Sequence, residues 1–224
     1  MSLVAACEIN YFYLDGDTRR YILKDVSCEF VSGRFYVILG ESGSGKTTFL
    51  SLLAALDKPQ SGRILFDGQD ISSIGFEAFR RNKIGIIFQS YNLISYMTAT
   101  ENVRIAMGIT DNKLPQDTDE IATNLLNYVG LDKAKANRIV STLSGGEQQR
   151  VAIARALSTN VDLILADEPT GNLDEDMESE IVYILKELAH EHNKCVIVVT
   201  HSYPIAQKAD IVLKLRKGKI EQYK

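Results

Sequence analysis

The chain has 224 residues, 45% of them hydrophobic, which is enough for one sizeable core and too few for two large independent domains. Its 25 basic and 29 acidic residues give a formal net charge of -4, so no positive field is available to attract a nucleic-acid backbone. No apolar run approaches the roughly 20 residues that span a bilayer, and residues 1–8 lack the features of a signal peptide. We therefore predict one cytoplasmic, enzyme-sized unit without nucleic acid as a partner.

The three cysteines and two of the three histidines give no sign of a functional role. The three cysteines, Cys7, Cys28 and Cys195, lie far apart without any Cys-x-x-Cys spacing. That pattern favours a reducing compartment and no metal site, so we expect small buried side chains. His190 and His192 lie at the polar end of a helical pattern, where we expect them to be solvated.

Strand and helix patterns alternate along the chain. The first thirty residues and the segment 62–68 are typical of antiparallel strands and turns, a β-rich flank. Aliphatic runs at 35–39, 84–88, 162–166, 195–200 and 211–215 predict strands buried on both faces of a mainly parallel sheet. Helical patterns lie between them, most clearly at 174–190, where Ile181, Ile184, Leu185 and Leu188 share one face. The alternation predicts an α/β fold.

The segment 99–137 differs from the rest, because it shows helical patterns without a convincing strand and carries Pro115 in a polar loop. We interpret it as a helical lobe inserted between core strands. Residues 1–98 and 138–224 then form the core with its β flank, and the whole chain is one domain.

The strongest motif follows the run 35–39 and precedes a helical run at 49–56. It consists of Gly40, Glu41, Ser42, Gly43, Ser44, Gly45, Lys46 and Thr47, and we include the adjoining Thr48 among its phosphate contacts. Its glycines let backbone N–H groups turn around a triphosphate, and the helix adds its positive N-terminal dipole. Lys46 is expected to reach the β- and γ-phosphates, and the Thr47 hydroxyl to bind Mg²⁺. The motif predicts a phosphate-binding loop but leaves the reaction open.

Two carboxylates, Asp167 and Glu168, follow the apolar run 162–166. The carboxyl edge of an open parallel sheet is where ligands bind. We predict that Asp167 holds Mg²⁺ through its water shell and that Glu168 orients and deprotonates the attacking water. Alone, such a pair could equally be a helix N-cap and a solvated carboxylate. Beside the phosphate loop, the catalytic interpretation is favoured.

A third motif, residues 143–150, is another glycine-containing turn that opens a helical run at 151–157. Ser144, Gly145 and Gly146 at its start predict a second anion-binding helix N-terminus, although in isolation they are also typical of a capping turn. One nucleotide needs only one phosphate cradle, so the second favours a nucleotide held by another copy. We therefore predict a head-to-tail dimer with two shared sites.

Together the motifs at 40–47, 143–150 and 163–168 resemble the nucleotide-binding domain of ABC transporters, and the resemblance covers practically the whole chain. It implies the ABC ATPase fold, with a P-loop core, a mainly parallel sheet, an antiparallel β flank and a helical lobe whose signature helix starts near residue 143. It also implies that ATP and Mg²⁺ are bound and that ATP is hydrolysed.

The resemblance assigns roles to single residues as well. Tyr13 stands where the family stacks an aromatic ring on adenine, with Tyr11 as the alternative. Gln89 matches the loop glutamine that reaches Mg²⁺ and the attacking water and transmits movement to the membrane subunit. His201 matches the switch histidine that contacts the γ-phosphate, and residues 169–174 resemble the loop that meets its twin across the dimer.

Within the family, the segments 57–59, 80–85, 88–93 and 167–174 are similar to the subgroup serving macrolide exporters, lipoprotein-releasing complexes and peptide-antibiotic resistance transporters. Glu41 and Glu147 depart from that pattern, which often has proline and glutamine there. Neither change removes a phosphate donor.

The subgroup resemblance implies a cytoplasmic subunit held at the inner face of the cell membrane by a separate integral membrane permease, and powering export or extraction of a peptide, lipoprotein or drug. The surface near residues 89–98, together with the helical lobe, is the predicted docking face, although the apolar side chains of this segment can also be buried within the lobe.

Three other classes remain open from the sequence. A P-loop kinase or GTPase would explain the motif at 40–47 but gives no purpose to residues 143–150 or His201. A soluble ABC ATPase of DNA repair or translation would need a long coiled-coil insertion or a duplicated motor. A regulatory ABC ATPase that transmits force to a membrane partner without moving cargo fits nearly as well as a transporter subunit.

Overall fold

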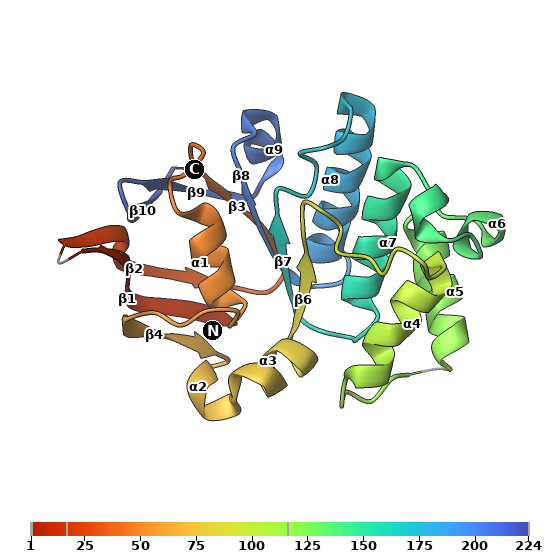
Figure 1. Cartoon of the computed structure of the whole chain (residues 1–224), viewed down its shortest axis with the longest axis horizontal. Helices are drawn as coiled ribbons and strands as arrows, with labels where there is room; N and C mark the ends of the chain where they lie inside the picture. The colour runs from red at the N-terminus through yellow and green to blue at the C-terminus, as the bar shows by residue number, and fades with distance from the viewer. Residues whose placement is uncertain (1, 17, 116, 224) are drawn as a thin grey trace.

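The computed structural model describes residues 2–16, 18–115 and 117–223 and contains two sheets (Figure 1). The larger sheet has the strand order β10-β9-β3-β8-β7-β6. Its strands are β3 (Arg34–Leu39), β6 (Ile84–Ile87), β7 (Leu163–Asp167), β8 (Cys195–Thr200), β9 (Ile211–Arg216) and β10 (Lys219–Gln222). All neighbouring pairs are parallel except β9 and β10, which form an antiparallel hairpin at one edge. This is the predicted mainly parallel sheet.

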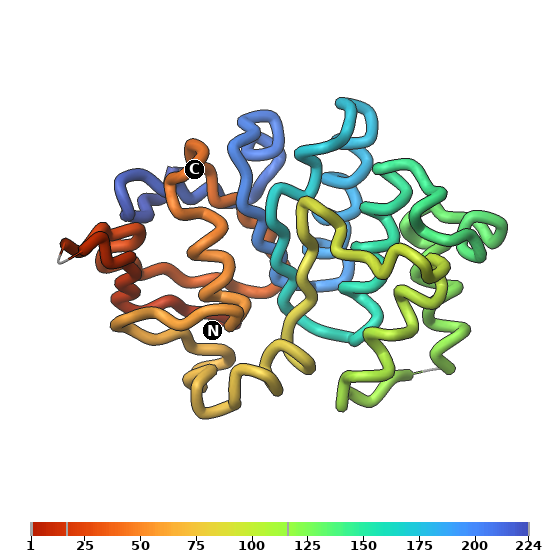
Figure 2. Tube along the Cα trace, in the orientation of Figure 1, coloured from red at the N-terminus to blue at the C-terminus, as the bar shows by residue number. Residues whose placement is uncertain are grey.

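The smaller sheet is antiparallel and has the order β2-β1-β4-β5. It consists of β1 (Val4–Asp15), β2 (Thr18–Phe30), β4 (Ser61–Phe66) and β5 (Gln69–Asp70). Strands β2 and β10 contact each other, and the first and last strands of the chain lie in the half of the molecule opposite α4 to α7 (Figure 2). The Lys24 N–H donates to the Gly218 carbonyl at 2.8 Å and joins the two sheets there.

Nine α-helices lie among the described residues. They are α1 (Lys46–Leu53), α2 (Ile71–Ile74), α3 (Phe76–Asn82), α4 (Ala99–Ile109), α5 (Thr118–Tyr128), α6 (Lys133–Ala136), α7 (Gly145–Leu157), α8 (Glu175–His190) and α9 (Tyr203–Lys208), with one 3₁₀ turn at Val140–Thr142. Figure 1 shows α4 to α7 gathered at the end of the molecule away from the small sheet.

Alternating side chains of the larger sheet divide the apolar residues into two cores. On β3, Tyr36 and Ile38 belong to the core that also contains Phe49 of α1 and the small sheet. Phe35 and Val37 belong to the other core, which is filled from α4, α5, α7 and α8. Because a strand turns successive side chains to opposite faces, α1 and α7 lie on opposite sides of this sheet.

Helix α8 shows how the sequence specifies an element. The Asp174 carboxylate caps it by accepting the Met177 N–H at 2.9 Å, and acidic residues in the first turn complement the helix dipole. Its predicted apolar face is buried: Ile181 and Leu185 are fully inaccessible. Each such side chain contributes about 1.5–3 kcal/mol of hydrophobic free energy.

Two expectations about single residues are wrong. His190 is not simply solvated, because its Nε2 lies 2.9 Å from Oδ2 of Asp210, which also accepts the Phe35 N–H at 2.8 Å. Burial acts to raise the pKa of Asp210, but the hydrogen bonds from Phe35 and His190 hold it below its ordinary value. Of the three cysteines, Cys195 is buried, whereas Cys7 and Cys28 are partly exposed on the small sheet.

In the described part of the chain, no helix combines the length and apolar character needed to cross a bilayer.

Candidate active site

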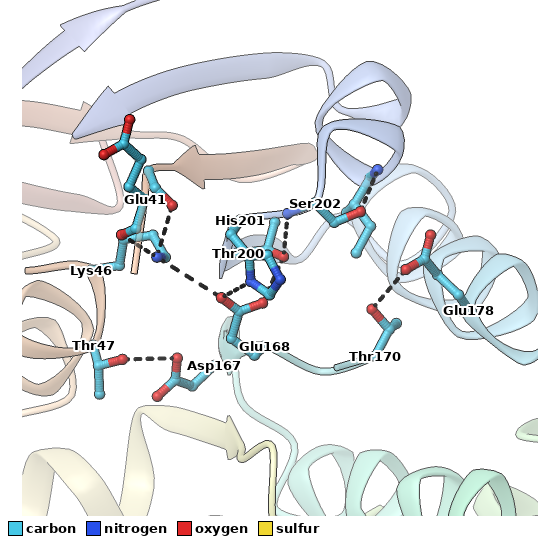
Figure 3. Close-up of polar contacts among 12 residues, drawn as sticks. Glu41, Lys46, Thr47, Asp167, Glu168, Thr170, Glu178, Thr200, His201 and Ser202 are labelled. Carbon is cyan, nitrogen blue, oxygen red and sulfur yellow. Dashed lines mark hydrogen bonds and ion pairs between the residues drawn. The ribbon is translucent and has the colours of Figure 1, made fainter. Parts of the chain in front are cut away.

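Four neighbouring strands bring the predicted site residues to one edge of the larger sheet. In spatial order, β3 leads into the loop 40–45, β8 leads into His201, β7 ends at Asp167 and is followed by Glu168, and β6 leads to Gln89. All four run parallel, so their carboxyl ends meet at this edge. Residues more than a hundred positions apart in the sequence are therefore adjacent, as Figure 3 shows for Thr47 and Asp167.

The loop between β3 and α1 has a backbone that requires glycine. A Cβ atom on Gly40 would lie 2.5 Å from Ser44 Oγ and 2.8 Å from the Leu215 carbonyl. Gly45 has φ 102°, and a Cβ atom there would meet Ile22 of β2 at 2.9 Å. Gly43, at φ 77°, has open space beside it. The loop is thus curved and fixed at its two ends by β2, β9 and its own chain.

Two polar groups of the loop, the Lys46 ammonium and the Ser44 hydroxyl, are buried. Lys46 Nζ is almost fully buried and donates to the carbonyl oxygens of Gly40 at 2.9 Å and Glu41 at 3.0 Å. Ser44 Oγ is buried without a hydrogen-bond partner. A buried ammonium and an unpartnered hydroxyl fit a phosphate group, which would accept from both. The Glu41 and Ser42 side chains are exposed, and Thr48 is half-buried on α1.

Thr47 and Asp167 form a pair of oxygen ligands beside this loop. Thr47 Oγ1 donates to Asp167 Oδ1 at 3.2 Å. Burial raises the pKa of Asp167, and the nearby Glu168 carboxylate raises it further, whereas the Thr47 hydroxyl lowers it. A hydroxyl and a carboxylate at this distance fit Mg²⁺, which prefers hard oxygen ligands and completes its shell with phosphate oxygens and water. A nearby dication would also relieve the mutual repulsion of the two carboxylates.

The Glu168 carboxylate is held from two sides (Figure 3). Its Oε2 accepts from Thr200 Oγ1 at 2.8 Å, and its Oε1 lies 2.8 Å from His201 Nδ1 and 3.9 Å from Lys46 Nζ. The residue has φ 43°, a left-handed conformation that costs a non-glycine residue free energy. Its side chain is 14% exposed, while that of His201 is 68% exposed. A carboxylate fixed in this way and still partly exposed can accept a proton from a water molecule near the loop.

Gln89 lies next to the loop 169–174 in this structure. Its carbonyl accepts from Asn172 Nδ2 at 3.2 Å, and its Nε2 lies 2.9 Å from the position that a Cβ atom on Gly171 would take. In the described structure, no hydrogen bond joins its side chain to Thr47 or Asp167. The predicted contact of Gln89 with Mg²⁺ therefore stays a prediction, one that needs the side chain to turn.

Of the two candidate tyrosines, Tyr13 is the available one. Tyr13 is 53% exposed. It pairs with Arg20 in the β1–β2 hairpin, and Ile22 of the same hairpin lies against Gly45 of the phosphate loop. Tyr11 is buried, and its hydroxyl donates to Asp57 Oδ2 at 2.5 Å, a bond that raises its pKa. The ring of Tyr13 packs edge-on against Tyr11, at 5.4 Å between centroids. Tyr13 thus has a free face for stacking.

The predicted signature residues lie apart from the phosphate loop. Ser144 caps α7 by accepting the Glu147 N–H at 3.3 Å. A Cβ atom on Gly145 would lie 2.9 Å from the Tyr91 hydroxyl, and one on Gly146 would lie 3.0 Å from Met177 Sδ. Strands β6 and β7 separate α7 from α1 in Figure 1. A single chain therefore brings together Thr47, Asp167, Glu168 and His201. Residues 144–146 of the same chain lie outside this group.

Sequence reasoning missed several residues of this site. Thr200 holds the Glu168 carboxylate, and Arg155 donates to the carbonyls of Tyr91 at 2.8 Å and Asn92 at 2.5 Å. A hydroxyl directly before His201 at a strand end was the available signal for Thr200. The Arg155 contact joins residues 63 and 64 positions apart, and no local pattern indicates it.

Comparison with known proteins agrees with this geometry. The family model described as ABC transporter matches residues 23–171. The ABC transporter ATP-binding protein YclH of Bacillus subtilis (strain 168) is 47% identical over 97% of this chain and 95% of its own length. The lipoprotein-releasing system ATP-binding protein LolD of Buchnera aphidicola is 41% identical over 99% and 97%. The macrolide export ATP-binding/permease protein MacB of Syntrophobacter fumaroxidans is 40% identical over 99% of this chain and 31% of its own length.

Solved structures give the same assignment. A dimeric structure of MJ0796, a bacterial ABC transporter cassette, has a TM-score of 0.88 and 37% identity over 97% of this chain and 96% of that one. A post-hydrolysis dimer of the same cassette bound to ADP and Pi has a TM-score of 0.89 and 36% identity over 99% and 98%. The chain therefore belongs to the ABC transporter family as an ATP-binding subunit, and it hydrolyses ATP to ADP and phosphate.

Proposed function

We propose that this ATPase drives a separate integral membrane permease that exports or extracts a peptide, lipoprotein or drug. LolD belongs to a lipoprotein-releasing system, and MacB is a macrolide export protein that carries ATP-binding and permease parts. Both are similar to nearly the whole of this chain, which supports the exporter subgroup. The chain would then act at the cytoplasmic face of the membrane, held there by the permease.

In the proposed catalytic cycle, Tyr13 stacks on the adenine and the loop N–H groups bind the phosphates. Lys46 exchanges its bonds to the Gly40 and Glu41 carbonyls for the β- and γ-phosphate oxygens. Mg²⁺, when bound to Thr47 and Asp167, would neutralise charge between these phosphates. Glu168 accepts the proton of the attacking water, and His201, whose Nδ1 lies 2.8 Å from the Glu168 carboxylate, contacts the γ-phosphate.

Two copies share each site in this proposal. Ser144, Gly145 and Gly146 close over the nucleotide bound by the partner copy, where the N-terminus of α7 adds N–H donors and a positive dipole. The observation that carries the proposal is that α1 and α7, whose N-termini are both proposed to bind phosphate, pack on opposite faces of one sheet. In this proposal a second copy supplies the missing half of each site.

The segment 89–98 is the proposed contact with the permease. Tyr96 in it is 76% exposed, whereas Leu93 packs against the core beneath. Arg155 of α7 holds the backbone of Tyr91 and Asn92, so a movement of α7 on dimer closure would displace this segment.

Complementation between two inactive variants tests the shared sites. Lys46→Ala disables the phosphate loop, and Gly145→Asp places a carboxylate where the partner's nucleotide would bind. Each variant alone is expected to be inactive, because every site in its dimer lacks one half. In an equal mixture, half of the dimers are mixed and hold one intact site of two, so about a quarter of normal activity should return. An inactive mixture, with both variants folded, would contradict the shared site.

A further inference from the structure

A negative charge lies at the N-terminus of α7, beside the residues proposed to bind the partner's nucleotide. Glu147 Oε2 accepts the Ser144 N–H at 2.9 Å, while the Ser144 hydroxyl accepts the Glu147 N–H, which makes a reciprocal capping box. The side chain is 19% exposed. A carboxylate here stabilises the helix, but it also repels an anion that approaches the same N-terminus.

One cation lies against this carboxylate. Lys135 Nζ, from the short helix α6, is 3.0 Å from Glu147 Oε1. The two Glu147 oxygens are thus divided: Oε2 serves the cap and Oε1 serves the lysine. The hydrogen bond from the Ser144 N–H and the contact with Lys135 both lower the pKa of Glu147, so it is ionised at neutral pH. Lys135 has no other ion pair within 4.0 Å among the described residues.

We propose that Lys135 is a positioning residue for ATP-driven dimerisation: it neutralises Glu147, so that α7 can receive the γ-phosphate of the nucleotide bound to a second copy of this chain. The inference rests on the proposed function, in which Ser144 to Gly146 close over that nucleotide. Lys135 acts through Glu147 and does not itself contact the phosphate.

The physical argument concerns where the charges lie when the dimer closes. In water a single carboxylate would repel an approaching phosphate only weakly, because water and counterions screen its charge. Dimer closure excludes water from the α7 N-terminus, and repulsion between two anions grows several-fold as the effective dielectric constant falls. The ion pair between Lys135 and Glu147, already formed in the single chain, removes this repulsion and leaves the α7 capping box intact. The neighbouring Lys133, on the same helix, makes no ion pair within 4.0 Å in the described structure and serves as a matched control.

The experiment uses the full-length chain carrying Glu168→Gln, in which ATP-bound dimers should accumulate. Sedimentation with Mg-ATP would give the monomer–dimer dissociation constant of this background. The same constant would be measured after adding one of four single substitutions, Lys135→Met, Lys135→Arg, Lys133→Met or Glu147→Gln, and after adding Lys135→Met and Glu147→Gln together. Glutamine also completes a capping box, so Glu147→Gln removes the charge and keeps the helix start. Binding of ATP to the dilute monomer provides a second readout.

Lys135→Met should weaken dimerisation about tenfold at low salt, and the loss should shrink as salt is raised. Adding Glu147→Gln should restore the original value, Lys135→Arg should keep it, and Lys133→Met should leave it nearly unchanged. ATP binding to the monomer should not change in any variant. If Lys135→Met remains equally weak after Glu147→Gln, Lys135 does not act through Glu147 and the inference is wrong. If the background itself stays monomeric with ATP, the proposed shared site fails, and the inference falls with it.

Discussion

Glu168→Gln is the substitution whose consequences the structure defines most closely. The amide has the shape of the carboxylate and can still accept from Thr200 through its oxygen. Its NH₂ group can donate to Nδ1 of His201 in the tautomer that carries the proton on Nε2. We therefore expect a change in the free energy of unfolding of less than about 1 kcal/mol.

Catalysis should respond much more strongly, because an amide cannot take a proton from water. Loss of a general base lowers the rate by about 10²- to 10⁴-fold, equivalent to about 3–5 kcal/mol in the activation free energy. Binding should respond in the opposite direction. Glu168 Oε1 lies 3.9 Å from Lys46 Nζ, so removing its charge takes away an anion that competes with the phosphates for this ammonium and repels them. We expect ATP to bind severalfold more tightly and the ATP-bound dimer to accumulate.

Phosphate release at saturating Mg-ATP, measured against protein concentration, gives the hydrolytic rate, and size-exclusion chromatography with Mg-ATP gives the dimer fraction. Glu191→Gln, an exposed carboxylate beyond α8, is the matched control and should behave as the unmodified chain. Activity in the unmodified chain should rise steeply with protein concentration. If Glu168→Gln kept more than about a tenth of that activity, the assignment of Glu168 as the base would be refuted.

Three further substitutions have defined outcomes. Asp167→Asn should stabilise the ligand-free chain at pH 7 by up to about 1 kcal/mol in urea unfolding. Burial raises the pKa of Asp167 in the folded state, so the charged carboxylate opposes folding at pH 7. The gain in stability should disappear below about pH 4, where the carboxyl group is protonated in both the folded and the unfolded chain. Tyr13→Ala should raise the KM for ATP about 5- to 100-fold by removing a stacking partner, whereas Tyr13→Phe should not; equal effects would point to the hydroxyl instead. Arg155→Lys loses one of the two bonds to the carbonyls of Tyr91 and Asn92 and should cost about 1–3 kcal/mol in thermal or urea unfolding; an unchanged midpoint would show that this backbone is held by other contacts.

Local chemistry explains which features could be predicted from the sequence. The glycines, the lysine and the threonine of the phosphate loop all lie within residues 40–47, and a short apolar run before them specifies the strand that carries them. The α/β class, the parallel sheet and the buried face of α8 follow from periodicity, because strand and helix periods expose different residues to the core. ATP hydrolysis was implied by the family resemblance that the combined motifs carry.

Contacts across the sheet could not be predicted in this way. Three such contacts each join groups at least 20 positions apart: Thr200 with Glu168, His190 with Asp210, and Arg155 with the backbone carbonyls of residues 91 and 92. Cys7 and Cys28 follow no local rule for burial, since their exposure depends on which face of the small sheet is covered.

The sequence by itself determined the set of groups that this protein can bring to a triphosphate, because each motif is a local property of backbone and side chain. Only the tertiary structure decided which of them meet. Strand order brings the carboxyl ends of β3, β8, β7 and β6 together and so joins Lys46, Thr47, Asp167, Glu168 and His201, while the same sheet keeps α7 on its other face. The physical reason is that a sheet has two faces and one carboxyl edge, and neither can be assigned to a residue until the strands have been ordered.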